Sequence, residues 1–136
     1  MKRTPLRRKS DRQKVIEKCD ALFRKYILRE RGEKCEWCKK NTKVFVSHIL
    51  PKGRYPNMRY KENNVLLLCF YCHFHRWHKS PLDANEFLGK YKGDDYYEQL
   101  RKQAVMAKRV VPEMTLLYLT ELIKEKSLLD IAWKKY

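Results

Sequence analysis

Four of the five cysteines stand in two Cys-x-x-Cys pairs, Cys35 with Cys38 and Cys69 with Cys72. Four thiolates are soft donors that suit a closed, tetrahedral structural zinc site, because each pair can bend around the metal in a tight turn. A redox use fits less well, since nothing around the pairs resembles a thioredoxin unit. Thirty residues separate Cys38 from Cys69, more than a minimal zinc ribbon needs. The spacing therefore predicts a structural Zn²⁺ site with a segment inserted between its two halves.

The inserted segment and its edges carry His48, Asn64 and His73, in that order along the chain. His48 ends an alternating run, Asn64 stands five residues ahead of Cys69, and His73 directly follows Cys72. Histidine titrates near neutral pH, so it can act as a general base or hold a metal ion. A plainer alternative is a zinc module that is purely structural or binds DNA without cutting it. An RNA-binding zinc knuckle would explain the basic charge but not the His, Asn, His order.

These residues resemble the HNH, or ββα-metal, endonuclease superfamily, in its version where two cysteine pairs clamp the motif. The segment Val46–Pro81 is similar, more specifically, to phage recombination nucleases of the NinG/Rap type, and the likeness covers about residues 33–92. The resemblance implies a metal-dependent DNA endonuclease that hydrolyses phosphodiester bonds in phage DNA recombination or processing. Duplex DNA and branched or junction DNA are both open as its substrate. A non-catalytic zinc-knuckle protein that binds DNA remains the alternative.

The resemblance also implies a catalytic role for each of the three residues. His48 matches the general base that takes a proton from water before the water attacks phosphorus. His73 matches a ligand of the catalytic cation, Mg²⁺ or Mn²⁺, which would stabilise the charge that develops on the phosphate. Asn64 matches the middle asparagine, whose amide orients the loop and thereby positions His48.

One position departs from the pattern of the superfamily. Many relatives carry aspartate directly before the catalytic histidine as a metal ligand, whereas this chain has Ser47, and a serine hydroxyl is a poor ligand. Water, His78 or His75 could complete the shell of the cation. On a regular helix, however, His78 lies about 140° and His75 about 200° around the axis from His73. His78 is therefore kept as a candidate ligand only for a helix that ends early.

Positive charge is concentrated in the first two thirds of the chain. The whole chain has 32 Lys and Arg against 16 Asp and Glu, a net charge of +16. Residues 1–34 carry 13 basic and 5 acidic side chains, residues 35–80 carry 9 and 2, and residues 81–136 carry 10 and 9. A generally solvated basic surface would spread this excess evenly, so we expect the first two thirds to face DNA. The basic residues predicted to contact DNA are Arg54, Arg59, Arg7, Arg8 and Lys9.

Hydrophobic periodicity and turn residues predict the elements that must position these side chains. A capping box at Ser10 and Gln13 predicts the start of an amphipathic helix over residues 11–31, and Gly32 is placed to end this helix. Cys19 falls on the apolar stripe of the helix, so we expect it to be a core residue. The remaining expected elements are a strand over 43–49, an irregular loop over 51–63, a buried strand over 65–68, and helices over 70–79, 81–91, 94–108 and from 112 onward.

Together these elements predict an α+β fold, with a zinc-stapled ββα-metal (HNH) core, an N-terminal helix and additional C-terminal helices. Residues 1–9 are expected to form a basic flexible arm, because they combine five basic side chains with Pro5 and no acid. Residues 10–92 would then form the nuclease core with its N-terminal helix. Residues 93–136 would be a C-terminal helical extension of the same domain.

The sequence also bears on location and partners. It has no run of about 18 apolar residues that could span a membrane, and no apolar stretch follows its basic N-terminus as a secretion signal requires. We therefore expect a cytoplasmic protein, in the host cell if a phage encodes it, with no membrane partner. Cutting a junction needs two symmetric incisions, so a homodimer through the nearly neutral C-terminal helices is expected if that substrate is right.

Overall fold

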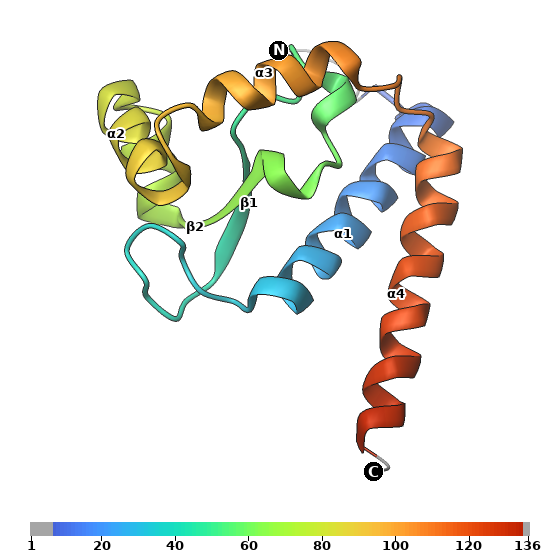
Figure 1. The fold of residues 1–136 in the computed structure, drawn as a ribbon. Helices are drawn as coiled ribbons and strands as arrows, with labels where there is room; N and C mark the ends of the chain where they lie inside the picture. Colours follow the sequence, from blue (N-terminus) through green and yellow to red (C-terminus); the bar gives the residue numbers. More distant parts are fainter. Residues whose placement is uncertain (1–6, 135–136) are drawn as a thin grey trace, which may run out of the picture. The chain divides into compact units, whose positions relative to one another are not determined.

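The computed structural model describes the backbone of residues 7–134 and the side chains of residues 7–125. It confirms an α+β fold with a two-stranded sheet and several helices (Figure 1). The principal elements are α1 (Asp11–Arg31), β1 (Val44–His48), β2 (Val65–Cys69), α2 (Pro81–Lys92), α3 (Tyr96–Met106) and α4 (Pro112–Lys134). The shorter ones are the 3₁₀ turns η1 (Pro56–Met58) and η2 (Glu62–Asn64) and the π-helix η3 (Tyr71–Trp77).

The chain divides into two compact units. One comprises residues 27–110, and the other comprises the described residues up to Tyr26 together with those from Val111 onward. Every cysteine and histidine predicted to act as a ligand or catalyst lies in the first unit. The division into an arm, a core ending at residue 92 and an extension stays a prediction.

The unit formed by residues 27–110 is organised around β1 and β2, which pair antiparallel (Figure 1). In their register Val44 lies opposite Cys69, and His48 lies opposite Val65. All five residues of β2 are buried, because its Val-Leu-Leu-Leu-Cys run has no polar side chain to present to water. The sheet therefore places Cys69 and His48 at opposite ends of the same strand pair.

The helix predicted over residues 70–79 is present but has an unexpected pitch. Residues Tyr71–Trp77 form a π-helix, and the N–H of His78 donates to the carbonyl of His73 at 3.2 Å, a bond between residues five apart. Such a bond brings residues five apart to roughly one full turn, whereas an α-helix does so for residues about four apart. The expectation of a regular helix here was wrong, and this changes which side chains share a face.

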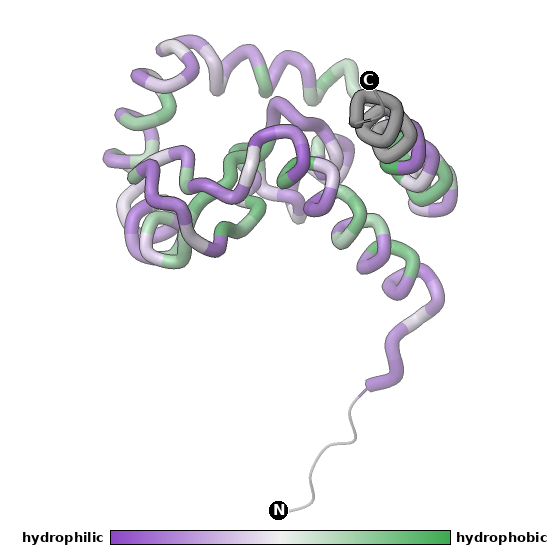
Figure 2. The backbone as a smooth tube through the Cα atoms, turned by 90° about the horizontal axis from the view of Figure 1, so that it is seen from below, coloured by the Kyte–Doolittle hydropathy of each residue, from purple (hydrophilic) through white to green (hydrophobic). Residues whose placement is uncertain are grey.

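The second unit pairs the N-terminal part of α1 with α4. The capping box is confirmed, because the Ser10 N–H donates to Gln13 Oε1 at 3.0 Å and the Gln13 N–H donates to Ser10 Oγ at 3.2 Å. The thiol of Cys19 is fully buried and donates to the carbonyl of Pro112 at 3.4 Å, which confirms the fifth cysteine as a core residue. Hydrophobic and hydrophilic residues alternate along the helix that leads to the C-terminus (Figure 2). This pattern is typical of helices that bury only one face.

None of the helices described between residues 7 and 134 combines the length and the apolar character that a membrane crossing requires.

Candidate functional site

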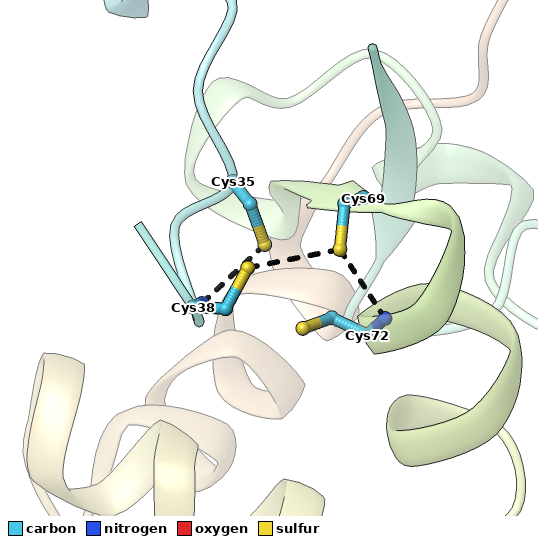
Figure 3. A group of neighbouring side chains, drawn as sticks. All are labelled: Cys35, Cys38, Cys69 and Cys72. Atoms are coloured by element: carbon cyan, nitrogen blue, oxygen red, sulfur yellow. Dashed lines mark hydrogen bonds between the residues drawn. The ribbon is translucent and has the colours of Figure 1, made fainter. Parts of the chain in front are cut away.

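The four paired cysteines converge to form a candidate metal centre (Figure 3). Their sulfur atoms all lie within 4.8 Å of one another, and Cys38 Sγ lies 3.8 Å from Cys69 Sγ. Sulfur atoms arranged tetrahedrally at a Zn–S distance of about 2.3 Å are themselves about 3.8 Å apart. The cluster can therefore hold a zinc ion with little rearrangement. Across the described residues, no other set of three or more His, Cys, Asp or Glu side chains converges in this way.

Each cysteine pair forms a tight turn whose backbone supports the sulfur atoms. The Cys38 N–H donates to Cys35 Sγ and the Cys72 N–H donates to Cys69 Sγ, both at 3.5 Å (Figure 3). Lys39 closes the first turn in the left-handed conformation, with φ at 65° and its N–H donating to the Cys35 carbonyl at 3.0 Å. N–H groups aimed at sulfur favour the thiolate, the form that binds a metal ion.

The pKa values of the Cys35 and Cys72 thiols differ, and a bound cation would favour the thiolate form of both. Burial works to raise the pKa of Cys35, but backbone hydrogen bonds around it outweigh that effect and lower the pKa to about 7. Burial and the neighbouring Cys69 raise the pKa of Cys72 to about 12, although Arg76 opposes them. Four thiolates packed together repel one another, so a divalent cation supplies the charge that lets all four deprotonate.

Aromatic packing fixes the metal centre to α2. The guanidinium of Arg76 lies 3.8 Å from Cys72 Sγ and 4.1 Å from the ring centroid of Trp37. The Trp37 ring stacks on Phe87 of α2, with centroids 4.5 Å apart and an interplanar angle of 6°. Trp37 therefore packs against both the Phe87 ring and the Arg76 guanidinium.

Arg31 and Glu36, which the sequence did not single out, connect the end of α1 to β2. Arg31 donates to the Val65 carbonyl at 2.7 Å and to the Glu62 carbonyl at 2.6 Å, and it pairs with Glu36 at 3.2 Å. Glu36 also accepts the backbone N–H of Leu67 and lies between Cys35 and Cys38 in sequence. A charged pair beside a cysteine has no distinctive spacing, so only the fold reveals its role.

His48 occupies the last position of β1 and its ring is fixed in one tautomer. Its Nε2 lies 2.9 Å from the carbonyl oxygen of Arg59. A carbonyl only accepts hydrogen bonds, so Nε2 carries a proton, and in a neutral ring Nδ1 would be the nitrogen that accepts one. A general base at this position would therefore act through Nδ1.

Asn64 is fully buried and braces the loop that holds His48. Its Oδ1 accepts the Leu50 N–H at 2.8 Å, while its Nδ2 donates to the carbonyls of Leu50 at 3.1 Å and Met58 at 3.0 Å. Met58 directly precedes Arg59, whose carbonyl binds His48. One amide thus fixes both the start of the loop and the segment that orients the histidine.

The π-helix brings His78 onto the face of His73. Their ring centroids lie 4.6 Å apart at an interplanar angle of 77°. The pitch of a regular α-helix would have separated the two side chains, and the π-helix removes this objection to His78 as a ligand. His75 lies elsewhere, with its ring against Tyr71 at 5.4 Å and Phe70 at 5.9 Å. The structure therefore separates the two alternatives: His78 is beside His73, and His75 is not.

His73 is held neutral and carries an unsatisfied nitrogen. Burial, together with smaller contributions from the nearby His78 and then His48, lowers its pKa to about 4. Its Nδ1 and the Oγ of Ser47 are buried side-chain atoms without a hydrogen-bond partner in the described part of the chain. Buried polar atoms are normally paired, so an unpaired imidazole nitrogen of a neutral ring fits a ligand for a cation.

The residues predicted to contact DNA lie in two places. Arg54 is exposed on the loop before η1, where its guanidinium lies 5.8 Å from the Tyr55 ring, whereas Arg59 is half-buried. In the second unit Arg7, Arg8 and Lys9 are exposed, and Lys9 forms an ion pair with Glu17 at 2.6 Å. The rest of the predicted arm, residues 1–6, lies outside the described residues.

Comparison with protein-family models, with curated proteins and with solved structures gives no match to this chain. The likeness to HNH nucleases therefore stays a prediction, and the function has to be argued from the geometry of the site.

Proposed function

We propose that this protein is a metal-dependent DNA endonuclease of the HNH kind. The observation that carries the proposal is the position of His48 at the end of β1, with Nε2 donating to the Arg59 carbonyl, together with the adjacent rings of His73 and His78. A purely structural zinc knuckle does not require the bond from His48 to the Arg59 carbonyl, and it does not require the paired rings of His73 and His78. An endonuclease needs both a base and a ligand for a cation in that place.

In the proposed reaction His48 Nδ1 accepts a proton from a water molecule, and the water oxygen attacks phosphorus in line with the departing 3′ oxygen. His73 and His78 would hold a divalent cation, which when bound stabilises the negative charge on the phosphate and on the leaving oxygen. Asn64 keeps the loop in place, so the Arg59 carbonyl holds His48 in the correct tautomer through each cycle. The Cys35, Cys38, Cys69 and Cys72 site would hold Zn²⁺ and join the two strands to η3.

The cation is proposed to be Mg²⁺ or Mn²⁺, with two imidazoles and no carboxylate from the protein. Both ions prefer oxygen ligands, so water and phosphate oxygens would complete their shell, whereas imidazole suits later transition ions. Ser47 supplies at most a weak ligand. An activity assay should therefore compare Mg²⁺ and Mn²⁺ with Co²⁺, Ni²⁺ and Zn²⁺.

The proposed substrate is DNA, either duplex or branched, in phage recombination or processing within the host cytoplasm. The segment from Trp37 to Lys61 contains no carboxylate and includes most of the loop between His48 and Asn64, which has one acidic residue, Glu62, at its end. The arginines of this loop would contact phosphates, and so would Arg7, Arg8 and Lys9. Because such contacts release counterions, we expect affinity to fall steeply as salt concentration rises.

The test incubates the protein with each cation and with linear, nicked, supercoiled and four-way DNA, beside His48→Ala and His75→Ala. We expect cleavage by the wild type and by His75→Ala, whereas His48→Ala should bind DNA normally and cut at least 100-fold more slowly. No cleavage under any condition would overturn the enzymatic proposal. Equal cleavage by His48→Ala would overturn the assignment of the base.

A non-catalytic zinc-knuckle protein that binds DNA is the second candidate. It is favoured by Ser47, which stands where a carboxylate ligand would be expected, and by the finding that no second group of three or more His, Cys, Asp or Glu side chains converges among the described residues. DNA binding with zinc bound but without cleavage would support it.

A homodimer through the C-terminal helices is proposed for a junction substrate. Met114, Leu117 and Tyr118 lie three and four residues apart on α4, and their exposed fractions are 64%, 63% and 65%. Such a face suits a second copy of the chain. Light scattering should report a dimer that Leu117→Glu converts to a monomer, and a wild-type monomer would remove this part of the proposal.

A further inference from the structure

An exposed aromatic surface adjoins the candidate catalytic histidines. We call it the aromatic patch and define it by Phe45 of β1 and by Phe70, Tyr71 and Phe74 at the start of η3. Exposed fractions are 58% for Phe70, 63% for Tyr71 and 39% for Phe74. Aromatic side chains of this size are normally buried, and leaving several of them together in water is unfavourable. The patch therefore calls for a binding partner.

The rings of the patch support one another rather than standing singly. Phe70 and Phe74 have centroids 4.8 Å apart, and Phe45 lies 5.7 Å from Phe74 and 6.4 Å from Phe70. Tyr71 stacks on His75 at 5.4 Å and an interplanar angle of 29°. Mutual packing holds the rings in place, so little conformational entropy would be lost when a flat partner covers them.

The patch is continuous with the candidate catalytic site. The Phe74 ring lies 4.5 Å from that of His73, and Phe45 stacks on His73 at 6.0 Å with an interplanar angle of 12°. Phe74 also lies 6.3 Å from His78. Anything that covers the patch would reach the position where the proposed cation holds a phosphate.

The charge around the patch selects the kind of partner. Residues 63–82 and 37–61, which supply all its rings, contain no aspartate or glutamate. Lys43 Nζ lies 5.7 Å from the Phe45 ring centroid. An apolar protein partner would gain nothing from this positive charge. A partner with flat apolar faces and negative charge fits both features.

We propose that the aromatic patch stacks unpaired nucleobases of DNA next to the scissile phosphate. Within a duplex the faces of each base are covered by its neighbours, and only unstacked or single-stranded nucleotides present a face to an aromatic ring. The inference rests on the proposed DNA-cutting function and names its substrate class: DNA with unpaired nucleotides at the cleavage site, such as a flap, a gap or the centre of a junction. A fully paired duplex would reach the same site with lower affinity.

The test measures binding with the cleavage-deficient His48→Ala chain, with and without Phe70→Ala and Tyr71→Ala together. Fluorescence anisotropy compares a paired duplex with the same duplex carrying a three-nucleotide gap, and 2-aminopurine in the gap reports stacking by quenching. Leu82→Ala is the matched control, because Leu82 is 82% exposed in the same unit but lies outside the patch. Zinc content confirms that each variant is folded.

We expect the double variant to lose about 5- to 100-fold in affinity for gapped DNA and at most about 2-fold for the duplex. Quenching of 2-aminopurine should disappear, while the dependence of affinity on salt should keep its slope, since no phosphate contact is removed. Phe70→Trp alone should retain gapped-DNA binding, because a larger ring still offers a stacking face.

Equal losses for gapped and paired DNA, or no loss, would overturn the proposal while cleavage dependent on His48 still supports the enzyme. If the chain binds no DNA of any kind, both the aromatic-patch proposal and the proposed function are overturned.

Discussion

Replacing Asn64 with alanine should destabilise the protein severely, and Asn63 provides a matched control one residue away. The buried Asn64 amide makes three hydrogen bonds, one from the Leu50 N–H and two to the carbonyls of Leu50 and Met58. Each bond contributes about 1 kcal/mol, and the three backbone groups would be left buried without partners. We therefore expect Asn64→Ala to lower the free energy of unfolding by about 3–5 kcal/mol.

Asn63 is exposed, and its side-chain Nδ2 donates to Gln103 Oε1 at 2.7 Å in an exposed hydrogen bond. Asn63→Ala should therefore change the free energy of unfolding by no more than about 0.5 kcal/mol. Urea unfolding of the zinc-loaded chains, followed by tryptophan fluorescence, measures both values. A cost below about 1 kcal/mol for Asn64→Ala, or equal costs for the two variants, would refute the role of Asn64 as the brace of the loop.

Asn64→Asp adds a pH dependence whose sign follows from the same contacts. The aspartate could still accept the Leu50 N–H, but its second oxygen would face two carbonyl oxygens, so the neutral acid is favoured and its folded-state pKa rises above about 3.9. The unfolded chain then ionises first, and raising the pH favours unfolding. The destabilisation by Asn64→Asp relative to wild type should therefore grow as the pH rises from about 4 to the folded-state pKa and stay constant above it, and a loss that shrinks with rising pH would contradict this geometry.

Three further predictions test the candidate zinc site, the proposed ligand pair on η3 and the proposed phosphate contact of Arg54. Cys69→Ser should abolish stoichiometric zinc binding measured by elemental analysis and leave the chain largely unfolded, whereas Cys19→Ser should retain one zinc per chain; zinc loss from both variants would place Cys19 in the site. His78→Ala should weaken binding of the second cation about 10-fold or more in calorimetry on zinc-loaded protein, whereas the same change at His75 should not, and equal effects would reject the pair on η3. Arg54→Ala should reduce the slope of log affinity against log salt by about 1, and an unchanged slope would show that Arg54 contacts no phosphate.

The local elements of the fold were largely predictable because their signals are short-range. The capping box and Gly32 fixed the limits of α1, and the Val-Leu-Leu-Leu-Cys run indicated a buried strand. The convergence of the four cysteines also followed from spacing, since two tight turns can share one tetrahedral metal ion. These features depend on residues within a few positions of one another, where sequence patterns are most informative.

The geometry around the histidines was less accessible from sequence. Nothing in the residues Tyr71–Trp77 distinguishes a π-helix from an α-helix, because the pitch depends on how the segment packs after the second cysteine pair. The bond from His48 to the Arg59 carbonyl joins residues eleven apart through an irregular loop. The Arg31 contacts with β2 likewise depend on tertiary placement, which periodicity does not encode.

The π-helix has a consequence for how this segment tolerates changes in length. Relative to an α-helix it contains one additional residue in the turn between His73 and His78, and it keeps the two rings together all the same. A chain shortened by one residue in that turn could form an α-helix with the same histidines four apart, again on one face. Because the two rings would stay aligned, this shortening would leave the direction of the chain after His78 nearly unchanged, whereas losing one residue from a continuous α-helix rotates everything after it by about 100°. The wider turn therefore absorbs one residue locally, so the segment between the two histidines can change in length while the histidine pair and the start of α2 keep their places.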